Sequence, residues 1–258
     1  DIRSGEDVKK LYTANDYLES TGVRIDIDSI VDIDYVIDEN YRKTFKGVEK
    51  FDAVILGHVI EHIPDIVFFF QDVMNVLKKD GKLIIIYPDA RYCFDHFRNG
   101  TTFIDAYDVH KNSENASKRV FDFVYNVVHE NRPTFFWNSN EVNKKLPKNS
   151  IDNALDAYEK AKRHELPDDM HFWPFADYQF AKFLYDMDRG GLLKLNIVDF
   201  YQTQHNTQEF MIILTPKNEM VIQHSKYQKI LNATHPVDKA RISALEKDKL
   251  NAQVVELE

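Results

Sequence analysis

Two short strings of residues in this sequence could support acid–base chemistry on a hydroxyl group. The first contains His58, Glu61 and His62 within five positions, directly after an apolar run. The second begins at His171 and continues through an aromatic strip that contains Trp173. A histidine that titrates near neutral pH can remove a proton from a hydroxyl, and an aromatic face stacks well on a sugar ring. The alternative is structural: His62 packs beneath the following helix, and the aromatic strip covers the edge of a sheet.

The first string also spells H-x-x-E-H, the inverted zincin motif of certain metallopeptidases. In that chemistry both histidines lie one helical turn apart and face a zinc ion, while the glutamate acts as the base. Pro64 counts against this function because it disfavours helical backbone at Ile63, and His58 ends an apolar strand. The zinc peptidase stays an alternative, and the sequence favours other functions.

A third group of charged residues follows a second apolar run. Asp89 and Arg91 come just after Pro88, and Arg98 follows seven positions beyond Arg91. Such side chains can hold a polar acceptor, for example a sugar, through charge-assisted hydrogen bonds. Alternatively, Asp89 and Arg91 pair with each other and brace the loop. We expect Asp89 and Arg91 to lie near an acceptor and Arg98 to be structural.

A strand–helix–strand unit is expected to position these groups. Phe51–Leu56 reads as a strand buried on both faces that ends at Gly57, and Asp65–Leu77 has helical spacing. Two lysines in a last helical turn, followed by Gly81, indicate the helix C-terminus. Lys82–Tyr87 then reads as a second buried strand. This pattern predicts a parallel βαβ unit, whose ligands bind at the carboxyl ends of the strands.

The rest of the chain predicts a mixed α/β fold. A weaker strand is expected at Ile30–Ile37, and residues 193–216 read as an antiparallel hairpin. Further helices are expected at Phe103–His110, Ala116–His129, Ile151–His164 and Ala176–Met187. We therefore expect a Rossmann-like sheet, mostly parallel with an antiparallel C-terminal hairpin, and helices on both faces. The expected domain covers residues 1–216 with a helical insertion at about 101–170, followed by a helical extension at 217–258.

Composition excludes several classes of function. The chain has 33 Lys and Arg against 42 Asp and Glu, a net charge of −9, which disfavours nucleic-acid binding through phosphate contacts. Its single cysteine, Cys93, excludes a disulfide framework and a thiolate-rich zinc site. No apolar run reaches the roughly 20 residues of a transmembrane helix, and the first residues do not form a signal peptide. A cytoplasmic protein is expected.

The order of these motifs resembles a known family. FDAVILGHVIEHIPD, with the following helix and VLKKDGKLIIIYPDARY, resembles the fourth and fifth strands of class I S-adenosylmethionine-dependent methyltransferases. The hairpin NIVDFYQTQHNTQEFMIIL resembles the sixth and seventh strands of that fold. YPDARYCFDHFRNGTT, MHFWPFADYQF and QEFMIIL resemble a bacterial subgroup that accompanies glycosyltransferases in surface-polysaccharide synthesis.

The resemblance implies S-adenosylmethionine as cofactor and assigns four residues to it. Gly57 and His58 would border the amino-acid end of the cofactor, and Asp38 would accept a hydrogen bond from the adenine amino group. Asp1 would bind the ribose hydroxyls. The alternatives are that Asp38 belongs to a turn and that Asp1 is solvated.

The resemblance also implies the roles around the acceptor. Its implied partners are a small-molecule or glycan acceptor and a fused or associated glycosyltransferase. Some family members that methylate phenolic oxygens hold a divalent cation at similar Glu-His positions, which leaves a metal open here, and we assign no metal ligand. The residues expected to bind the acceptor are Glu61, Arg91 and Trp173, and those expected to accept its proton are His62, Asp89 and His171.

One departure from the family concerns glycine. The family's first strand ends in a glycine-rich loop, where the backbone approaches the cofactor closely, yet none of the eight glycines here forms a Gly-x-Gly. We interpret the chain as a fragment that begins after that loop. The sequence thus predicts a methyltransferase, expected to methylate an oxygen of a sugar or related polar acceptor. The alternative is a non-catalytic methyltransferase-like interaction module of a larger protein.

Overall fold

The computed structural model describes residues 6–7, 9–10, 26–36, 44–130, 132–138, 142, 147, 149–167, 169–216 and 230. The chain divides into two compact units, Asp1–Lys50 and Phe51–Glu258. Asp1 and Asp38, the residues expected to bind the ribose and the adenine, lie outside the described residues. The expected C-terminal extension at 217–258 also lies outside them, except at residue 230.

Residues 26–36 of the first unit contain one turn of 3-10 helix, η1 (Ile27–Ser29). The strand predicted at Ile30–Ile37 is wrong for residues 30–36, none of which lies in a strand. Aspartates alternate with apolar residues in this segment, so a strand here would carry Val31, Ile33 and Tyr35 on one apolar face. Val31 and Tyr35 are nevertheless exposed, so this face is not buried as a core strand requires. The side chains are exposed or half-buried, and Val31 is 79% exposed.

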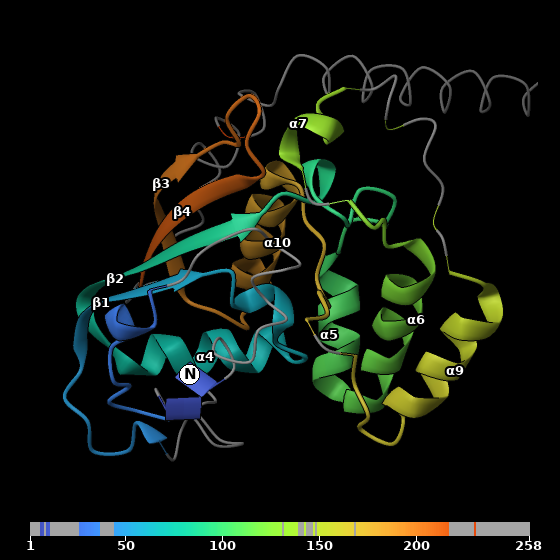
Figure 1. The fold of residues 1–258 in the computed structure, drawn as a ribbon. Helices are drawn as coiled ribbons and strands as arrows, with labels where there is room; N and C mark the ends of the chain where they lie inside the picture. The colour runs from blue at the N-terminus through green and yellow to red at the C-terminus, as the bar shows by residue number, and fades with distance from the viewer. Residues whose placement is uncertain are drawn as a thin grey trace, which may run out of the picture. The chain divides into compact units, whose positions relative to one another are not determined.

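The second unit is built on a mixed sheet with the strand order β1-β2-β4-β3 (Figure 1). The four strands are β1 (Phe51–Gly57), β2 (Leu77–Pro88), β3 (Leu195–Tyr201) and β4 (Glu209–Pro216). β1 and β2 are parallel, whereas β4 is antiparallel to both β2 and β3. The structure confirms the predicted α/β fold, with its parallel βαβ unit and its antiparallel hairpin. This topology is consistent with the fold of α/β methyltransferases.

The register of the sheet gathers the predicted site at one edge. Gly57, the last residue of β1, pairs with Ile86 near the end of β2. Pro88, the last residue of β2, pairs with Glu209, the first residue of β4. The residues that follow β1 and β2 therefore emerge beside the start of β4.

The helix between β1 and β2 is α4 (Ile66–Val76), and its start agrees with the prediction. The Asp65 side chain caps it by accepting a hydrogen bond from the backbone N–H of Phe68 at 2.9 Å. This carboxylate satisfies one of the backbone donors left free in the first turn.

The predicted end of this helix is wrong, because β2 begins at Leu77 and includes both lysines and Gly81. Lys78 donates to the Asp52 carboxylate of β1 at 2.8 Å, which ties the early part of β2 to its neighbour. A Cβ on Gly81 would lie 3.0 Å from the backbone oxygens of Lys78 and Phe51. The glycine thus permits a close backbone approach inside a strand rather than ending a helix.

The two parallel strands differ in burial. In β2, the side chains of Leu83, Ile85 and Tyr87 are buried. In β1, Ile55 is 66% exposed and Asp52 is also exposed, so the expectation of burial on both faces is wrong for β1. Among the described residues, β1 pairs with a strand on one side only.

The predicted helices are present with shifted ends. The principal helices after β2 are α5 (Phe103–Lys111), α6 (Ala116–Asn126), α7 (Pro133–Phe136), α9 (Ile151–Ala161) and α10 (Asp177–Arg189). α6 and α9 each end three residues earlier than predicted. Val127 leaves α6 in an extended conformation, and Val128 then bonds the backbone oxygen of Phe94. This long-range bond replaces the helical continuation that local spacing favours.

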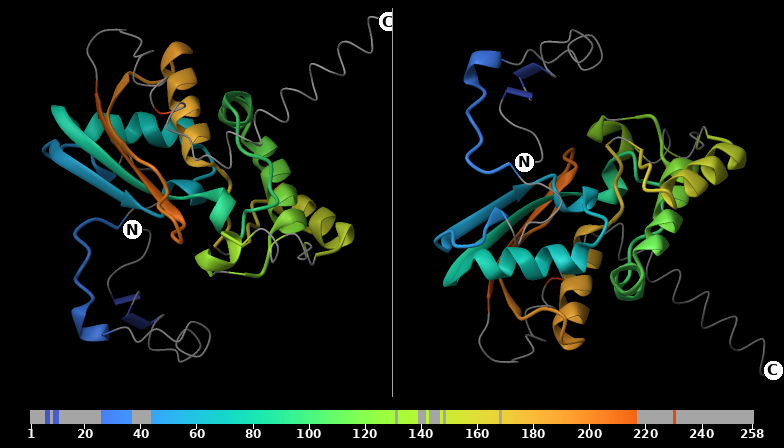
Figure 2. Two further views of the ribbon diagram at one scale, coloured as in Figure 1. Left: turned by 90° about the horizontal axis from the view of Figure 1, so that it is seen from above. Right: turned by 90° about the horizontal axis from the view of Figure 1, so that it is seen from below.

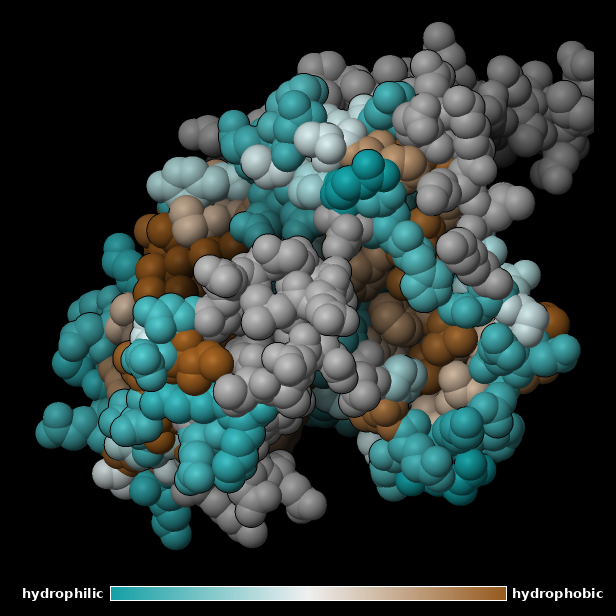
Figure 3. Space-filling view, viewed as in Figure 1, coloured by the Kyte–Doolittle hydropathy of each residue, from teal (hydrophilic) through white to brown (hydrophobic). Residues whose placement is uncertain are grey.

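Three of these helices form a group of their own. α5, α6 and α9 lie side by side beyond the carboxyl ends of β1 and β2 (Figures 1 and 2). Hydrophilic side chains cover the lower part of this group, at the lower right of the space-filling view (Figure 3). Lys160 and Asp156 of α9 form an ion pair at 2.7 Å. The helical group follows β2 in the chain and lies next to the edge where the site residues emerge.

An aromatic core joins the sheet to α4 and α10. The ring of Phe180 in α10 lies 4.9 Å from that of Tyr87 in β2 and 6.4 Å from that of Phe70 in α4. Phe210 of β4 stacks on Tyr87 with ring centroids 5.5 Å apart. All four rings are buried. Among the described residues, no helix combines the length and the apolar character that crossing a membrane requires.

Candidate functional site

Backbone hydrogen bonds connect the ends of β1 and β2 to the segment that precedes α10. The N–H of Phe172 donates to the backbone oxygen of Glu61 at 2.6 Å, and the N–H of Ala90 donates to that of Phe175 at 2.9 Å. These bonds hold residues 170–176 against the turns that follow the two strands. Segments more than 80 positions apart in the chain are thereby assembled into one site.

His58 occupies the turn directly after β1. Its backbone has φ 51°, a left-handed conformation that is uncommon outside glycine. Its Nε2 lies 2.8 Å from Glu209 Oε1, and its Nδ1 lies 3.4 Å from Glu61 Oε1. Among the described residues, no atom would lie within 4 Å of a Cβ built on the adjacent Gly57. The carboxyl end of β1 is therefore accessible beside a half-exposed histidine.

Glu61 is fully buried in the 3-10 turn η2 (Ile60–His62). Among the described residues, neither of its carboxylate oxygens has a hydrogen-bond partner. Burial raises the pKa of Glu61, while the neighbouring His171 and His58 act in the opposite direction. A buried carboxylate without hydrogen bonds is costly to maintain, which singles out Glu61 as a group that the fold alone does not satisfy.

His62 lies next to this carboxylate with one ring nitrogen already used. Its Nδ1 lies 3.0 Å from the backbone oxygen of Met170, so it carries the hydrogen and donates it. Its Nε2 lies 3.9 Å from Glu61 Oε1. Burial, followed by the charge of His171, lowers the pKa of His62. The ring is thus kept neutral, with the Nε2 lone pair free.

His171 is held in a buried network of charges. Its Nδ1 lies 2.6 Å from Asp95 Oδ2, and Arg98 binds both Asp95 Oδ1 at 2.7 Å and the backbone oxygen of His171 at 2.6 Å. Arg98 also pairs with Asp122 at 2.8 Å. Burial alone would raise the pKa of Asp95, but Arg98 and His171 outweigh it and lower the pKa to about 2. Asp95 therefore stays charged and orients the imidazole of His171.

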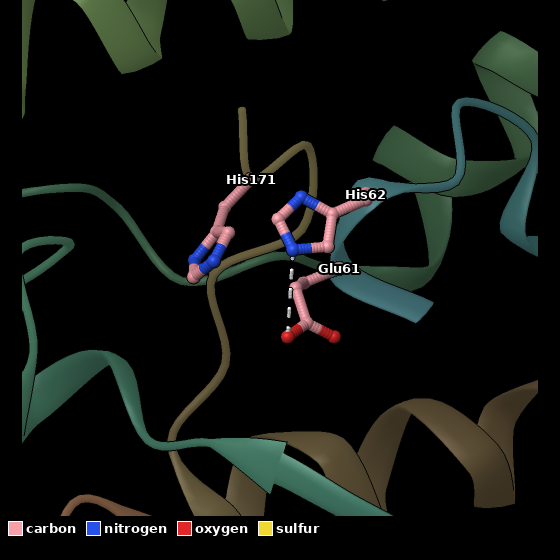
Figure 4. Close-up of side chains that lie close together, drawn as sticks. All are labelled: Glu61, His62 and His171. Atoms are coloured by element: carbon pink, nitrogen blue, oxygen red, sulfur yellow. Dashed lines mark ion pairs between the residues drawn. The ribbon is translucent and has the colours of Figure 1, made fainter. Parts of the chain in front are cut away.

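These contacts bring together three of the residues that the sequence singled out. The side chains of Glu61, His62 and His171 point toward one another (Figure 4), and one ligand atom from each lies within 4.8 Å of the others. The two imidazole rings meet edge to face with centroids 4.8 Å apart. Asp95, which orients His171, is absent from the predicted site. It is separated from that histidine by 76 positions, and no local pattern connects the two.

Asp89 and Arg91 form a separate paired cluster. The carboxylate of Asp89 accepts hydrogen bonds from Arg91 Nε at 2.9 Å and from Thr203 Oγ1 at 2.6 Å, and it is fully buried. Arg91 Nη2 also lies 2.8 Å from Asp177 Oδ1. Burial, followed by the charge of Asp89, raises the pKa of Asp177 to about 6. This arrangement favours the loop-bracing alternative for Asp89 and Arg91, since each is occupied by neighbours.

Trp173 packs inside the protein. Its side chain is fully buried, its Nε1 donates to the backbone oxygen of Ile63 at 2.6 Å, and the Arg119 guanidinium lies 5.5 Å from its ring centroid. Phe172 and Phe175 are buried as well. The indole therefore offers no exposed face on which a sugar ring could stack. The aromatic strip Phe172–Phe175 instead packs as part of the protein interior, which agrees with the structural alternative.

A cavity of about 540 Å³ adjoins the histidine cluster. Phe94 and Asp169 belong to its wall and also lie next to the cluster, with Phe94 4.5 Å from the His171 ring and Asp169 Oδ1 3.9 Å from His62 Nε2. The remaining lining residues are Phe123, Val124, Val127, Val128, His129, Glu130 and Asn149. No local sequence pattern marks this cavity, because its wall combines α6 with loops from distant parts of the chain. Its size is typical of small-molecule sites.

The H-x-x-E-H string does not form the helix that a zinc peptidase requires. His58 has a left-handed backbone, and the following residues form one 3-10 turn. His58 Nε2 bonds Glu209 rather than sharing a metal position with His62. The only histidine that joins His62 in the cluster is His171 from a distant segment, within the part of the chain that the structure describes.

No curated protein and no solved structure matches this chain. A family model does match residues 13–85, a range that contains β1, α4 and most of β2 together with Gly57, His58, Glu61 and His62. That model is described as a methyltransferase domain, and its match supports an S-adenosylmethionine-dependent methyltransferase of class I.

Proposed function

We propose that this protein methylates a hydroxyl oxygen of a sugar or related polar acceptor in glycan synthesis, with S-adenosylmethionine as the methyl donor. One observation supports this proposal most directly. Two imidazoles and a buried carboxylate converge where β1 ends, and they border a cavity through Phe94 and Asp169. The chain that carries them matches a methyltransferase domain. The proposal includes a glycosyltransferase, fused or associated, as the enzyme that supplies the acceptor.

The end of β1 has room for the cofactor. Within the part of the chain that the structure describes, open space borders Gly57, and His58 beside it is half-exposed. Ligands of α/β sheets bind at the carboxyl ends of parallel strands, which is where both residues lie. The cofactor would supply a methyl group activated on a sulfonium. In this proposal Gly57 and His58 border its amino-acid end, while Asp38 and Asp1 bind the adenine and the ribose.

The cavity fits a polar acceptor with a partly apolar body. The rings of Phe94 and Phe123 provide flat surfaces, and the carboxylate of Asp169 provides hydrogen-bond acceptors for hydroxyls, whereas Glu130 is already paired with Arg132. We assign the acceptor to this cavity rather than to Trp173, whose ring is fully buried.

A hydroxyl must lose its proton when it is methylated. The Nε2 atoms of His62 and His171 suit this role because each ring holds its hydrogen on Nδ1, bonded to Met170 or Asp95. A neutral imidazole can accept a proton near pH 7. Asp89 is a weaker candidate, since its oxygens already accept hydrogen bonds from Arg91 and Thr203.

Cofactor binding is the first test of this proposal. We would measure the binding of S-adenosylhomocysteine to the full-length protein by calorimetry, together with a Gly57→Phe variant and an Asp38→Ala variant. The phenyl ring would occupy the open space over Gly57 and is expected to weaken binding at least about tenfold, or about 1.4 kcal/mol. Ile55→Phe is the matched control, because it places the same ring on the exposed surface of β1.

The result separates the two functions that the sequence leaves open. Binding that is lost in Gly57→Phe and retained in Ile55→Phe supports the enzyme. No binding by the full-length wild-type protein would support a non-catalytic module instead. Transfer of methyl groups from S-adenosylmethionine to nucleotide sugars would then test the acceptor class.

A further inference from the structure

We propose that Glu61, His62 and His171 bind a divalent transition-metal ion. One ligand atom from each residue lies within 4.8 Å of the other two, and the three side chains converge from two distant segments (Figure 4). Two imidazoles and one carboxylate form a common set of protein ligands for zinc, and such sites leave a fourth position open. Imidazole nitrogens favour Zn²⁺, Fe²⁺ and Ni²⁺ over Mg²⁺ and Ca²⁺, so we commit to an ion of the zinc type.

The hydrogen bonds of both histidines already suit metal binding. His171 Nδ1 donates to Asp95 and His62 Nδ1 donates to the backbone oxygen of Met170, at 2.6 and 3.0 Å. Metal-binding histidines typically donate their second ring N–H to a carboxylate or a backbone carbonyl, which fixes the ring and its tautomer. Each ring thereby presents an unprotonated Nε2, and among the described residues neither Nε2 makes a hydrogen bond.

Glu61 provides an independent reason to expect a cation. The carboxylate is completely buried, and both oxygens lack a hydrogen-bond partner among the described residues. Native proteins seldom leave such a group unsatisfied unless an ion, a ligand or a functional role accounts for it. A cation bound between Glu61 and the two histidines would satisfy the carboxylate and offset the cost of its burial.

The distances require only a small closure around the ion. Bonds of 2.0–2.1 Å in a tetrahedral site place ligand atoms ~3.3 Å apart, whereas Glu61 Oε1 and His62 Nε2 are 3.9 Å apart and all three ligand atoms lie within 4.8 Å of one another. The supporting backbone is tied in place, since Phe172 N–H donates to the oxygen of Glu61 and Arg98 donates to that of His171. Closure around the ion is therefore expected in the side chains of Glu61, His62 and His171 rather than in the backbone.

A bound ion would change how this cluster acts on a hydroxyl. The ion would lower the pKa of a coordinated hydroxyl, and His62 and His171 would then be ligands rather than free bases. The metal site itself does not depend on the proposed methyl transfer. It is measured with the metal alone, without cofactor or acceptor, so its failure leaves the proposed function standing.

The test is a zinc titration of the full-length protein after chelator treatment, followed by calorimetry and by metal analysis of the dialysed protein. We expect one equivalent of tightly bound zinc. Glu61→Gln and His62→Gln should each weaken binding at least about 100-fold, and Asp95→Asn should weaken it by about 10–100-fold. His110→Gln is the matched control, because His110 Nδ1 also pairs with an aspartate, Asp65 at 3.0 Å, outside the cluster.

A second measurement guards against variants that merely fold poorly. In the absence of metal, Glu61→Gln should raise the melting temperature by about 2–4 °C, because it removes a buried charge. At the same zinc concentration, the melting temperature should rise clearly more for the wild type than for Glu61→Gln. Binding and metal-free stability thus change in opposite directions, which a folding defect cannot produce.

Three outcomes would overturn the proposal. The first is wild-type protein that binds no zinc above the level of Glu61→Gln. The second is equal loss of zinc in His110→Gln and His62→Gln, which would indicate adventitious binding by surface histidines. The third is a metal-free Glu61→Gln variant that is less stable than the wild type. Such a result would mean that His58, which lies 3.4 Å away, already stabilises the Glu61 carboxylate without a cation.

Discussion

His171 donates its Nδ1 hydrogen to Asp95 Oδ2 across 2.6 Å, although the two residues are 76 positions apart in the chain. Both side chains are buried, and the same aspartate is paired with Arg98 at 2.7 Å. A carboxylate in this position fixes the orientation and the tautomer of the imidazole. The Asp95–His171 pair therefore determines which nitrogen the site presents at the carboxyl end of β1.

Asp95→Asn is expected to destabilise the protein by about 3 kcal/mol, because it leaves the Arg98 guanidinium buried with only Asp122 to balance it. Urea unfolding at neutral pH measures the change. Asp122→Asn is the control, since it touches the same arginine but is 18% exposed and does not contact His171. If the two variants lost equal free energy of unfolding, Asp95 would contribute no more than Asp122 to balancing the charge of Arg98.

The raised pKa of Asp177 predicts that the stability of the protein depends on pH. Its folded-state pKa is raised to about 6 by burial and by Asp89, above the ordinary value of about 3.9. A raised pKa favours the protonated form, so its stabilising effect is complete below pH 4 and is lost as the pH rises through 6. Asp177→Asn lacks this titration. The free energy of unfolding of Asp177→Asn should therefore gain about 2 kcal/mol relative to wild type between pH 4 and pH 7.

Urea denaturation at several pH values measures this difference, and Asp186→Asn in the same helix controls for replacing an aspartate in α10. The opposite trend, in which Asp177→Asn loses stability relative to wild type as the pH rises, would mean that Arg91 keeps Asp177 charged in the folded protein. This alternative has a direct structural basis, because Arg91 Nη2 lies 2.8 Å from Asp177 Oδ1.

The two tryptophans should differ sharply in their contribution to stability. Trp173→Phe is expected to cost about 2–3 kcal/mol, because it leaves the backbone oxygen of Ile63 without its partner and opens a small void in the core. Trp137 makes a similar bond, from Nε1 to the oxygen of Thr207 at 2.8 Å, but near the surface.

Trp137→Phe should therefore cost less than about 1 kcal/mol, because water can replace the lost bond. Chemical denaturation of the two single variants compares them directly. A small effect at Trp173 together with weaker acceptor binding would instead restore the role in sugar stacking that the sequence predicts.

Filling the cavity should impair the acceptor without affecting the cofactor. Val124→Trp places a large ring in the cavity wall and is expected to lower kcat/KM for the acceptor at least about tenfold, or about 1.4 kcal/mol. Binding of S-adenosylhomocysteine should stay unchanged. Tyr125→Trp is the control, because it enlarges the neighbouring, exposed residue of α6 outside the cavity. If Val124→Trp transferred methyl groups as fast as the wild type, the cavity would not be the acceptor site.

The sequence by itself determined the parallel βαβ unit and the closing hairpin. The short apolar runs of β1 and β2, the helical spacing from Asp65 to Leu77 and the polar turn between β3 and β4 are local signals, and each predicted the element that forms. The sequence also identified Glu61, His62 and His171 as reactive residue types. Local signals were misleading at Gly81, where pairing between distant strands decided the outcome, and at Ile30–Ile37, where the apolar residues Val31 and Tyr35 stay exposed.

Only the tertiary structure decided what surrounds each of these residues. It buried Glu61 without hydrogen bonds, bonded Trp173 to Ile63 across 110 positions and paired Asp89 with Arg91 and Thr203. It also placed Asp95 behind His171. Burial and partner choice depend on which distant segments share one edge of the sheet, and spacing along the chain carries no record of that arrangement.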